Sequence, residues 1–294
     1  MRLRREEERY AAGLIAPSMI VVFGVILVPI LTTLYYSFVN IDPLSSHRGE
    51  FAGLGFYISA LTSKAFWEDF GRTLYFTVAS TAIETVFGLL IALLLNQKFP
   101  GVRLLRAIII IPWAIPTVVN GSLWKLMLNG EYGVVNAILL RLRLIDSYQS
   151  WLGNPKTAML CIVVADAWKM TPLAVIFFLA ALQAIDDSIY EAARVDGASP
   201  FDSFRAITLP ALRSTIMVIV VMRTVEKFKA FDIFYLMTRG GPANSTKTLM
   251  YDTYLQAFTN LNYSEAATNA YLIAISVALM TLVYIRLMKR EDSL

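Results

Sequence analysis

The sequence contains very little of the residues that build most catalytic and metal sites. Among its 294 residues there is one cysteine, Cys161, and one histidine, His47. A single cysteine excludes an internal disulfide, and an isolated histidine cannot supply the H-E-x-x-H pair of a zinc protease. The sequence also lacks the G-x-x-x-x-G-K-[ST] loop that cradles nucleotide phosphates. We therefore expect no metal, no cofactor and no enzymatic activity in this chain, and any ATP and Mg²⁺ would be used by a partner subunit.

Apolar residues dominate the chain. Hydrophobic residues make up 57% of the sequence and the mean hydropathy is +0.58, which is too high for a soluble domain. Because a helix rises about 1.5 Å per residue, roughly 20 apolar residues cross the ~30 Å hydrocarbon layer of a membrane. Six segments reach that length: 10–41, 73–96, 107–124, 157–185, 214–237 and 266–285.

Backbone groups within lipid must be hydrogen-bonded inside their own segment. We therefore expect an all-α membrane protein with six transmembrane helices. Residues 1–294 would form a single transmembrane domain, with a first helix at 10–41 and the other five helices in a core at 73–285.

Positive charges are distributed unevenly between the two sides of this topology. Lys and Arg are more numerous near the chain termini and near residues 98–106 and 194–213 than in the alternate connections. Connections rich in Lys and Arg stay on the cytoplasmic side. We therefore expect both termini, and the connection between the fourth and fifth helices, in the cytoplasm. The formal net charge of +4 then reflects topology rather than binding to nucleic acid.

A polar segment, residues 186–210, separates the fourth and fifth apolar stretches. Ser188 and the glutamate three residues after it match the S-x-x-E box that begins a helix. Gly197 suits the left-handed position that ends a helix, Ser199 followed by proline suits the start of the next, and Pro210 marks a further break. Five acidic residues against two basic ones are a poor match for anionic lipid, so we expect a helix–turn–helix that binds a protein partner.

The same segment contains the motif EAA-x3-G-x9-I-x-LP. Its specified positions are Glu191, Ala192, Ala193, Gly197, Ile207, Leu209 and Pro210. In this motif the chain resembles the integral-membrane permease subunits of bacterial binding-protein-dependent ABC importers. Three further stretches resemble the carbohydrate branch of that family, with its maltose and glycerol-phosphate permeases: IPWAIPTVV at 111–119, AWKMTPLAV at 167–175 and LMTRGGPANST at 236–246. The resemblance covers most of the chain from about Thr73 onward.

The resemblance implies a function and a set of partners. A permease of this kind is expected to form half of the path for a sugar-like solute across the bacterial cytoplasmic membrane, beside a second permease subunit and in contact with membrane lipid. Two copies of a cytoplasmic ATP-binding subunit would drive it, and an extracellular or periplasmic solute-binding protein would deliver the solute. The 186–210 segment would couple the ATPase to the pathway through Glu191, Ala192, Ala193, Asp196, Gly197, Ile207, Leu209 and Pro210.

Polar and aromatic residues inside the predicted spans are candidates for the solute pathway, because a charge in lipid is costly unless it is paired or faces water. A sugar site needs hydrogen-bonding groups and an aromatic face beneath the sugar ring. The candidates are Asn120, Trp124, Trp168, Lys169, Phe228, Phe231, Asp232 and Tyr235.

An internal network that holds the helices together is the alternative for the charged residues. Helical spacing allows Asp166 to pair with Lys169. It likewise allows Glu226 to pair with Arg223 or Lys229, and Asp232 to pair with Lys229. Glu84 would face the helix bundle, with a partner that the sequence does not identify.

The class of solute stays open at this point. Arg223, Lys227 and Lys229 would suit the phosphate of glycerol phosphate as readily as they suit internal ion pairs. Oligosaccharide, monosaccharide and polyol are equally compatible with the sequence. An ATP-independent secondary transporter is a further alternative, although such transporters usually contain internal repeats, and we find none here.

Overall fold

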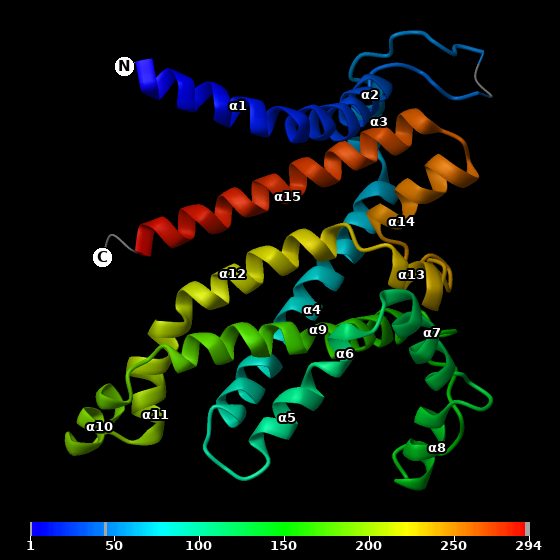
Figure 1. The fold of residues 1–294 in the computed structure, drawn as a ribbon. Coiled ribbons are helices and arrows are strands. Elements are labelled where there is room, and N and C mark those ends of the chain that lie inside the picture. Colours follow the sequence, from blue (N-terminus) through cyan, green and yellow to red (C-terminus); the bar gives the residue numbers. More distant parts are fainter. Residues whose placement is uncertain (1, 44–45, 292–294) are drawn as a thin grey trace. The chain divides into compact units, whose positions relative to one another are not determined.

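The computed structural model describes residues 2–43 and 46–291, and these residues contain helices and no β-strand. The expected domain limits at residues 1 and 294 lie outside the described residues. The helices are α1 (Arg2–Val22), η1 (Phe23–Leu27), α2 (Val28–Tyr36), α3 (Gly55–Thr62), α4 (Lys64–Leu95), α5 (Val102–Ile109), α6 (Ile111–Ala114), α7 (Thr117–Met127), α8 (Val134–Arg141), α9 (Ala158–Gln183), α10 (Asp187–Val195), α11 (Pro200–Ser203), η2 (Phe204–Thr208), α12 (Leu209–Phe228), α13 (Asp232–Met237), α14 (Leu249–Tyr254), η3 (Leu255–Thr259) and α15 (Tyr263–Glu291) (Figure 1).

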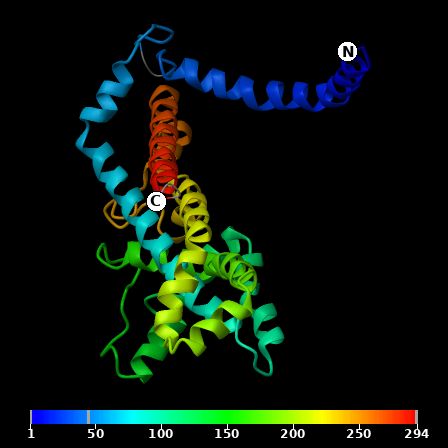
Figure 2. The ribbon, with the colours of Figure 1, turned by 90° about the vertical axis from the view of Figure 1, so that its left-hand side faces the viewer.

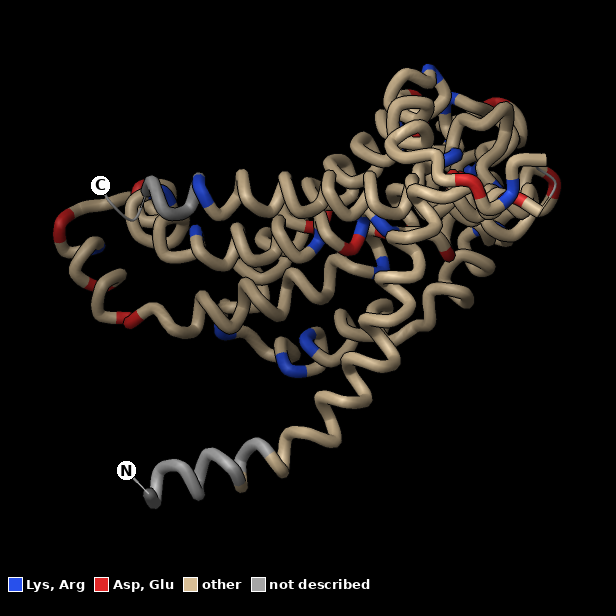
Figure 3. The backbone as a smooth tube through the Cα atoms, turned by 90° about the horizontal axis from the view of Figure 1, so that it is seen from above, with Lys and Arg blue, Asp and Glu red and all other residues tan. Residues whose placement is uncertain are grey.

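Within residues 2–43 and 46–291, five helical segments are long and apolar enough to cross a membrane. They are Gly13–Tyr36, Lys64–Leu95, Ala158–Gln183, Pro200–Phe228 and Tyr263–Arg286. Long stretches of the helical tube carry no charged residue (Figure 3). The limits of the expected first, fourth and sixth spans are within five residues of those of one of these helices. The second helix begins at Lys64 rather than at the expected residue 73, and the third and fifth spans differ further from the expectation.

The expected third span at 107–124 is not a straight helix. Two helical stretches, Val102–Ala114 and Thr117–Met127, meet at an angle of 94°. Ile115 between them is extended, with φ −72° and ψ 129°. The reason is Pro116, because a proline disfavours the helical conformation of the residue before it. The described residues therefore contain six candidate spans if the bent pair crosses as one, and five otherwise.

The expected fifth span at 214–237 has the wrong boundaries. The helix runs from Pro200 to Phe228, and α13 is a separate short helix that begins at Asp232. At the start, Ser199 and its proline begin the helix well before the apolar stretch. At the end, the chain leaves the helical conformation at Lys229, with φ −105° and ψ 14°.

Contacts divide the chain into two units, residues 1–66 with 253–272 and residues 67–252 with 273–294. In the first unit, hydrogen bonds join segments more than 200 positions apart. Ser264 Oγ donates to the Val39 carbonyl at 2.7 Å and accepts the Ile41 N–H at 2.8 Å. Tyr271 OH donates to the Ile30 carbonyl at 2.7 Å. None of the most apolar window of Gly13–Tyr36 is buried within the chain.

The apolar core of the second unit lies between α4, α9 and α12 (Figures 1 and 2). Its buried side chains are Ala92, Leu95, Ala174, Val175, Phe178, Leu182, Leu212 and Ile219. Gly88 lets α4 approach α9, because a Cβ at this position would lie only 2.6 Å from the Cβ of Ala174. This core holds the three helices that carry the buried charges described below.

The connection between α13 and α14 is held against α4. Lys247 Nζ lies 2.9 Å from Asp69 Oδ2 and 3.0 Å from Asp252 Oδ1. The Leu249 N–H donates to Thr73 Oγ1 at 3.0 Å. Burial by itself lowers the pKa of Lys247, but the hydrogen bonds to the two carboxylates raise it overall, so this lysine stays charged at neutral pH.

Candidate coupling segment and solute pathway

The first helix of the polar segment, α10, begins at Asp186 rather than at Ser188. Asp186 is extended, and its carboxylate accepts the backbone N–H of Ser188 at 2.9 Å. The expected capping box at Ser188 is therefore wrong, because Asp186 caps the helix two residues earlier and places Ser188 inside it. The hydrogen bonds from Ser188 lower the pKa of Asp186, and its negative charge suits the positive end of the helix dipole.

The turn after α10 confirms the prediction for Gly197. This residue has φ +82°, and a Cβ placed on it would meet no atom within 4 Å. The Gly197 N–H donates to the Arg194 carbonyl at 3.1 Å, and the Ala198 N–H donates to the Ala193 carbonyl at 2.9 Å. These two bonds are the Schellman pattern, in which a left-handed residue ends a helix. A side chain at Gly197 would therefore strain the backbone without any steric clash.

The second helix of the segment begins as predicted at Ser199. Its hydroxyl accepts the N–H of Asp202 at 3.2 Å, while the Asp202 carboxylate accepts the Ser199 N–H at 3.1 Å. The predicted break at Pro210 is wrong, because the chain continues without interruption from α11 through η2 into α12. Pro210 has no N–H to donate, and the π-helical turn just before it accommodates that missing bond.

Most of the predicted coupling residues are on the surface of the chain. Glu191, Ala192, Asp196, Gly197, Leu209 and Pro210 are exposed, while Ala193 and Ile207 are partly buried. Two apolar side chains beside them are also open, with Val195 88% and Phe201 70% exposed. Tyr190 and Thr208 share a hydroxyl–hydroxyl bond of 2.8 Å that ties α10 to the following helix. Hydrogen bonds between nearby residues thus stabilise the turn of this segment, and its exposed polar and apolar side chains are available to a partner.

Four charged side chains from three helices form a buried network in the second unit. Arg223 Nε on α12 lies 2.6 Å from Glu84 Oε2 on α4, and Lys227 Nζ lies 2.6 Å from Glu84 Oε1. Lys227 also pairs with Asp166 on α9, and Arg223 pairs with Glu226. Glu84, Arg223, Lys227 and Asp166 are each at least nine-tenths buried. Two acids and two bases therefore balance one another inside the bundle.

The network corrects one expected ion pair and confirms another. Asp166 contacts Lys227 rather than Lys169, whose Nζ lies 3.6 Å from Met170 Sδ. Lys227 is almost fully buried and Lys169 is not, so the carboxylate of Asp166 gains more by neutralising Lys227. Of the two partners expected for Glu226, Arg223 and Lys229, the structure shows an ion pair with Arg223.

A cleft of about 370 Å³ adjoins this network. Three predicted pathway residues, Lys169, Phe231 and Asp232, line it, together with Asp166, Thr117 and the network cations. Its wall thus combines hydrogen-bonding groups with one aromatic ring. This is a chemically suitable lining for a solute that carries several hydroxyl groups.

The remaining aromatic candidates are in two groups. Trp124 and Trp168 form an edge-to-face pair with ring centroids 6.0 Å apart. Phe231 lies 5.3 Å from Tyr235 and stacks on Tyr251 at 6.1 Å. The ring of Phe228 is fully buried against Phe70 and does not line the cleft.

Two buried polar atoms on α7 have no hydrogen-bond partner among the described residues. Asn120 donates through Nδ2 to the Ala165 carbonyl at 3.2 Å, but its Oδ1 accepts no bond. Trp124 Nε1, one helical turn further on, donates none. Since a buried polar atom without a partner is costly, a group that both donates and accepts would stabilise this face of α7.

The contacts that the sequence does not predict are those between residues far apart in the chain. Glu84 and Lys227 are 143 positions apart by their numbers, and no spacing rule links them. The available signal was a lone carboxylate within an apolar stretch, which predicts an unidentified partner but not which one. The pairing appears only when α4, α9 and α12 are packed together.

These features are those of a multi-pass membrane transport subunit. A family model described as a binding-protein-dependent transport system inner membrane component matches residues 84–292. The trehalose/maltose transport system permease protein MalF of Thermococcus litoralis is 37% identical, with 97% of this chain and 95% of that protein covered. The lactose transport system permease protein LacF of Rhizobium radiobacter is 34% identical over 91% of this chain and 90% of that protein.

A solved structure has the same fold. A chain from the crystal structure of a bacterial ABC transporter involved in the import of the acidic polysaccharide alginate superimposes with a TM-score of 0.84, over 99% of both chains and at 21% identity. The present chain belongs to the family of inner membrane components of binding-protein-dependent transport systems. The resemblance found in the EAA motif is therefore confirmed.

Proposed function

We propose that this chain is the permease subunit of an ATP-driven sugar importer, in which it forms half of the translocation path. The observation that carries the proposal is the EAA motif in the 186–210 segment, in a chain that belongs to an importer family. Asp186, Gly197 and Ser199 fix the ends of the helices in this segment, so that the motif lies on an exposed turn. The sugar is supported by relatives named for trehalose/maltose and lactose transport. The segment would transmit ATPase motion to the helices through α12, with which it is continuous.

The proposal includes the partners and the orientation. A second permease subunit would complete the path, two cytoplasmic subunits would bind ATP and Mg²⁺, and a solute-binding protein would deliver the sugar. The present chain would bind no cofactor and catalyse no reaction. Both termini and the 186–210 segment would face the cytoplasm, as the distribution of Lys and Arg favours.

The cleft beside the ion network is the proposed solute site of this chain. Lys169 and Asp232 would hydrogen-bond the sugar hydroxyls, and Phe231 would offer its ring face. The unpartnered atoms of Asn120 and Trp124 would bind sugar hydroxyls further along α7. A hydroxyl can donate to Asn120 Oδ1 and accept from Trp124 Nε1.

A neutral sugar or polyol is favoured over glycerol phosphate. Arg223 and Lys227 are the most deeply buried cations of the cleft, and each already lies against two carboxylates. A phosphate would have to displace the carboxylates of Glu84 and Asp166 and leave them buried without a partner, which is strongly unfavourable. The charge pairing therefore supports an uncharged solute.

The test is to tag this chain, solubilise native membranes gently and identify what co-purifies. We expect a nucleotide-binding subunit and a second, different permease. Reconstituted vesicles should take up a neutral disaccharide only with ATP, and glycerol phosphate poorly. A chain that purifies alone and moves solute without ATP would contradict the proposal and favour a secondary transporter.

A further inference from the structure

The short helix α8 presents a row of apolar side chains that the described residues leave open. Val134, Ile138 and Leu142 are 47%, 51% and 63% exposed. Their spacing of four residues places them on one side of the helix and its last turn. Exposed apolar side chains that lie side by side mark a surface that meets a protein or a membrane. The solute cleft and the 186–210 segment do not include this row.

The opposite side of α8 is held to the chain by Asn136, which is fully buried. Its Nδ2 donates to the carbonyls of Asn129 at 3.2 Å and Gln149 at 3.0 Å. Its Oδ1 accepts the Gln149 N–H at 3.1 Å and the Trp151 Nε1–H at 2.8 Å. The amide thus makes every hydrogen bond that it can make. Because α8 cannot turn the apolar row inward without breaking these bonds, the row stays on the surface.

A close turn joins α8 to the end of α7. A Cβ at Gly133, just before α8, would lie 2.4 Å from the Asn129 carbonyl oxygen and 2.6 Å from that of Met127. The Gly133 N–H donates to the Asn129 carbonyl at 3.0 Å. The position of α8 therefore bears on α7, which carries Asn120 and Trp124 of the proposed solute site.

In the proposed topology, α8 lies at the outer surface of the membrane. The 186–210 segment follows the cytoplasmic end of α9, so the start of α9 and the chain that leads into it from α8 are on the other side. Figure 1 shows α8 at the end of the second unit opposite to α10, with its axis running across that of α9. A helix that crosses the direction of a span lies along the membrane surface.

The residues that flank the apolar row have the chemistry of a membrane interface. Within residues 134–145 the charged residues are Arg141 and Arg143, and both are exposed. Two exposed tyrosines, Tyr132 and Tyr148, lie on either side of this stretch. Tyrosine is enriched where lipid headgroups meet water, and an interfacial helix combines an apolar face with basic side chains.

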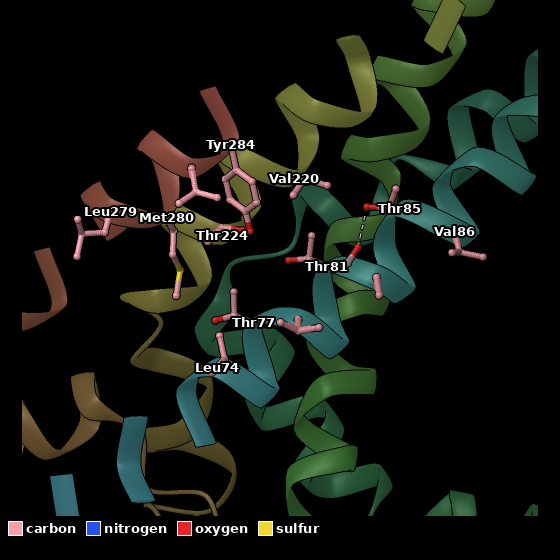
Figure 4. A pocket seen from close by; sticks show the side chains of 13 residues that line it. Leu74, Thr77, Thr81, Thr85, Val86, Val220, Thr224, Leu279, Met280 and Tyr284 are labelled. Carbon is pink, nitrogen blue, oxygen red and sulfur yellow. Dashed lines mark hydrogen bonds between the residues drawn. The ribbon is translucent and has the colours of Figure 1, made fainter. Parts of the chain in front are cut away.

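Two other exposed surfaces of the chain lack this combination. The apolar groove between α4, α12 and α15 has no charged residue in its lining (Figure 4), as expected of a surface within hydrocarbon. The 186–210 segment has five acidic residues against two basic ones, which disfavours anionic lipid. The α8 segment, by contrast, joins an apolar row to an excess of positive charge.

We propose that α8 lies in the headgroup interface of the outer leaflet of the cytoplasmic membrane, with Val134, Ile138 and Leu142 among acyl chains and Arg141 and Arg143 against lipid phosphates. Burial of the row is favourable, and each guanidinium forms charge-assisted hydrogen bonds with phosphate. A protein surface could cover the row but would need an acidic group for each arginine, whereas every phospholipid supplies one. This inference rests on the orientation in the proposed function.

Fluorescence quenching in the complete, reconstituted importer tests the proposal. The native cysteine is replaced by Cys161→Ser, and single cysteines from Ile138→Cys or Leu142→Cys receive the small fluorophore bimane. Asp146→Cys is the control, because this residue is exposed in the chain after α8. Each labelled importer is measured in bilayers whose lipids carry bromine on the acyl chains, and in ordinary bilayers with iodide in the water. The solute-binding protein is present throughout.

We expect brominated lipid to quench bimane at the two α8 positions several times more than at the control, and iodide to show the reverse order. Quenching of the α8 positions by iodide only would place the row in water and overturn the proposal. Protection from both quenchers would place it against the second permease or the solute-binding protein, and would overturn it as well. ATP-driven uptake by the same importer is measured in parallel. Uptake with α8 unquenched by lipid removes this inference and leaves the proposed function, whereas ATP-independent uptake with α8 quenched removes the proposed function.

The arginines are tested with Arg141→Gln and Arg143→Gln together in the importer labelled at Ile138→Cys. Brominated anionic phospholipid should quench about two- to threefold more than brominated zwitterionic phospholipid at the same mole fraction, because positive side chains near the surface attract anionic lipid. The double variant should lose this preference. Lys156→Gln, which removes an exposed cation outside the α8 segment, should keep it. Equal quenching by the two lipids before the arginines are changed would exclude their contact with headgroups.

Discussion

The coupling segment and the buried ion network differ in how far apart in the sequence their interacting atoms lie. Asp186 caps α10 through a residue two positions away, and Ser199 and Asp202 bond over three. Arg223 and Glu84 meet across 139 positions. The first region is exposed and local, while the second is buried and depends on three helices packing together. Substitutions in the coupling segment should therefore impair transport, whereas substitutions in the buried ion network should impair folding.

The largest effect is expected from Glu84→Ala. This change leaves Arg223 and Lys227 buried without the carboxylate they share, and breaking such a pair costs about 3–5 kcal/mol. We expect a marked drop in the thermal midpoint of the purified importer and in the amount of chain in the membrane. Glu226→Ala is the control, because it removes a carboxylate from the same arginine but one that is 45% exposed. Equal midpoints for Glu84→Ala and the wild type would show that the network does not hold the bundle together.

The second effect is expected from Gly197→Val, which should abolish uptake while the protein still inserts at a normal level. A β-branched residue is strained at φ +82°, so the turn that presents the EAA motif would be displaced. Gly101→Val matches it in backbone strain, with φ +88° and open space around the Cβ, but lies outside the segment. Solute uptake and membrane level are measured together for both. Normal uptake by Gly197→Val would contradict the coupling role.

A smaller effect is expected from Asp232→Ala in the cleft. Loss of one hydrogen bond to a sugar hydroxyl should lower uptake roughly three- to tenfold at low solute concentration, with basal ATP hydrolysis by the complex nearly unchanged. Asp146→Ala, an exposed aspartate that does not line the cleft, should leave both rates as they are. Parallel loss of uptake and hydrolysis in Asp232→Ala would point to a structural role instead.

The smallest effect is expected from Asp186→Ala, which removes the cap of α10. Limited proteolysis should cut the segment somewhat faster, while Asp186→Asn, which retains a capping side chain, should behave as the wild type. Because the pKa of Asp186 is lowered, its stabilisation is present above the ordinary carboxylate pKa and is lost only as the pH falls through the lowered value. The difference between Asp186→Ala and the wild type should thus be constant from pH 6 to 8. A difference that fades across this range would exclude the charged cap.

The sequence predicted the membrane setting and the EAA turn better than it predicted the spans with internal irregularities. Gly197 and Ser199 occupy the positions expected of them, because their bonds involve only neighbouring residues. The third span bends by 94° at Ile115. Pro116 predicts such a bend, but the length and hydropathy of the segment alone do not. The break predicted at Pro210 does not occur, because a π-helical turn just before it keeps the chain helical.

The sequence by itself determined that the chain is an all-helical membrane protein with an exposed EAA turn. Hydrophobic length and short-range capping depend on consecutive residues and need no knowledge of the packing. Only the tertiary structure decided that Glu84 neutralises Arg223 and Lys227, and that Asp166 pairs with Lys227 rather than with Lys169. The physical reason is desolvation: a charge carried into the bundle must pair with whichever opposite charge the packed helices bring beside it.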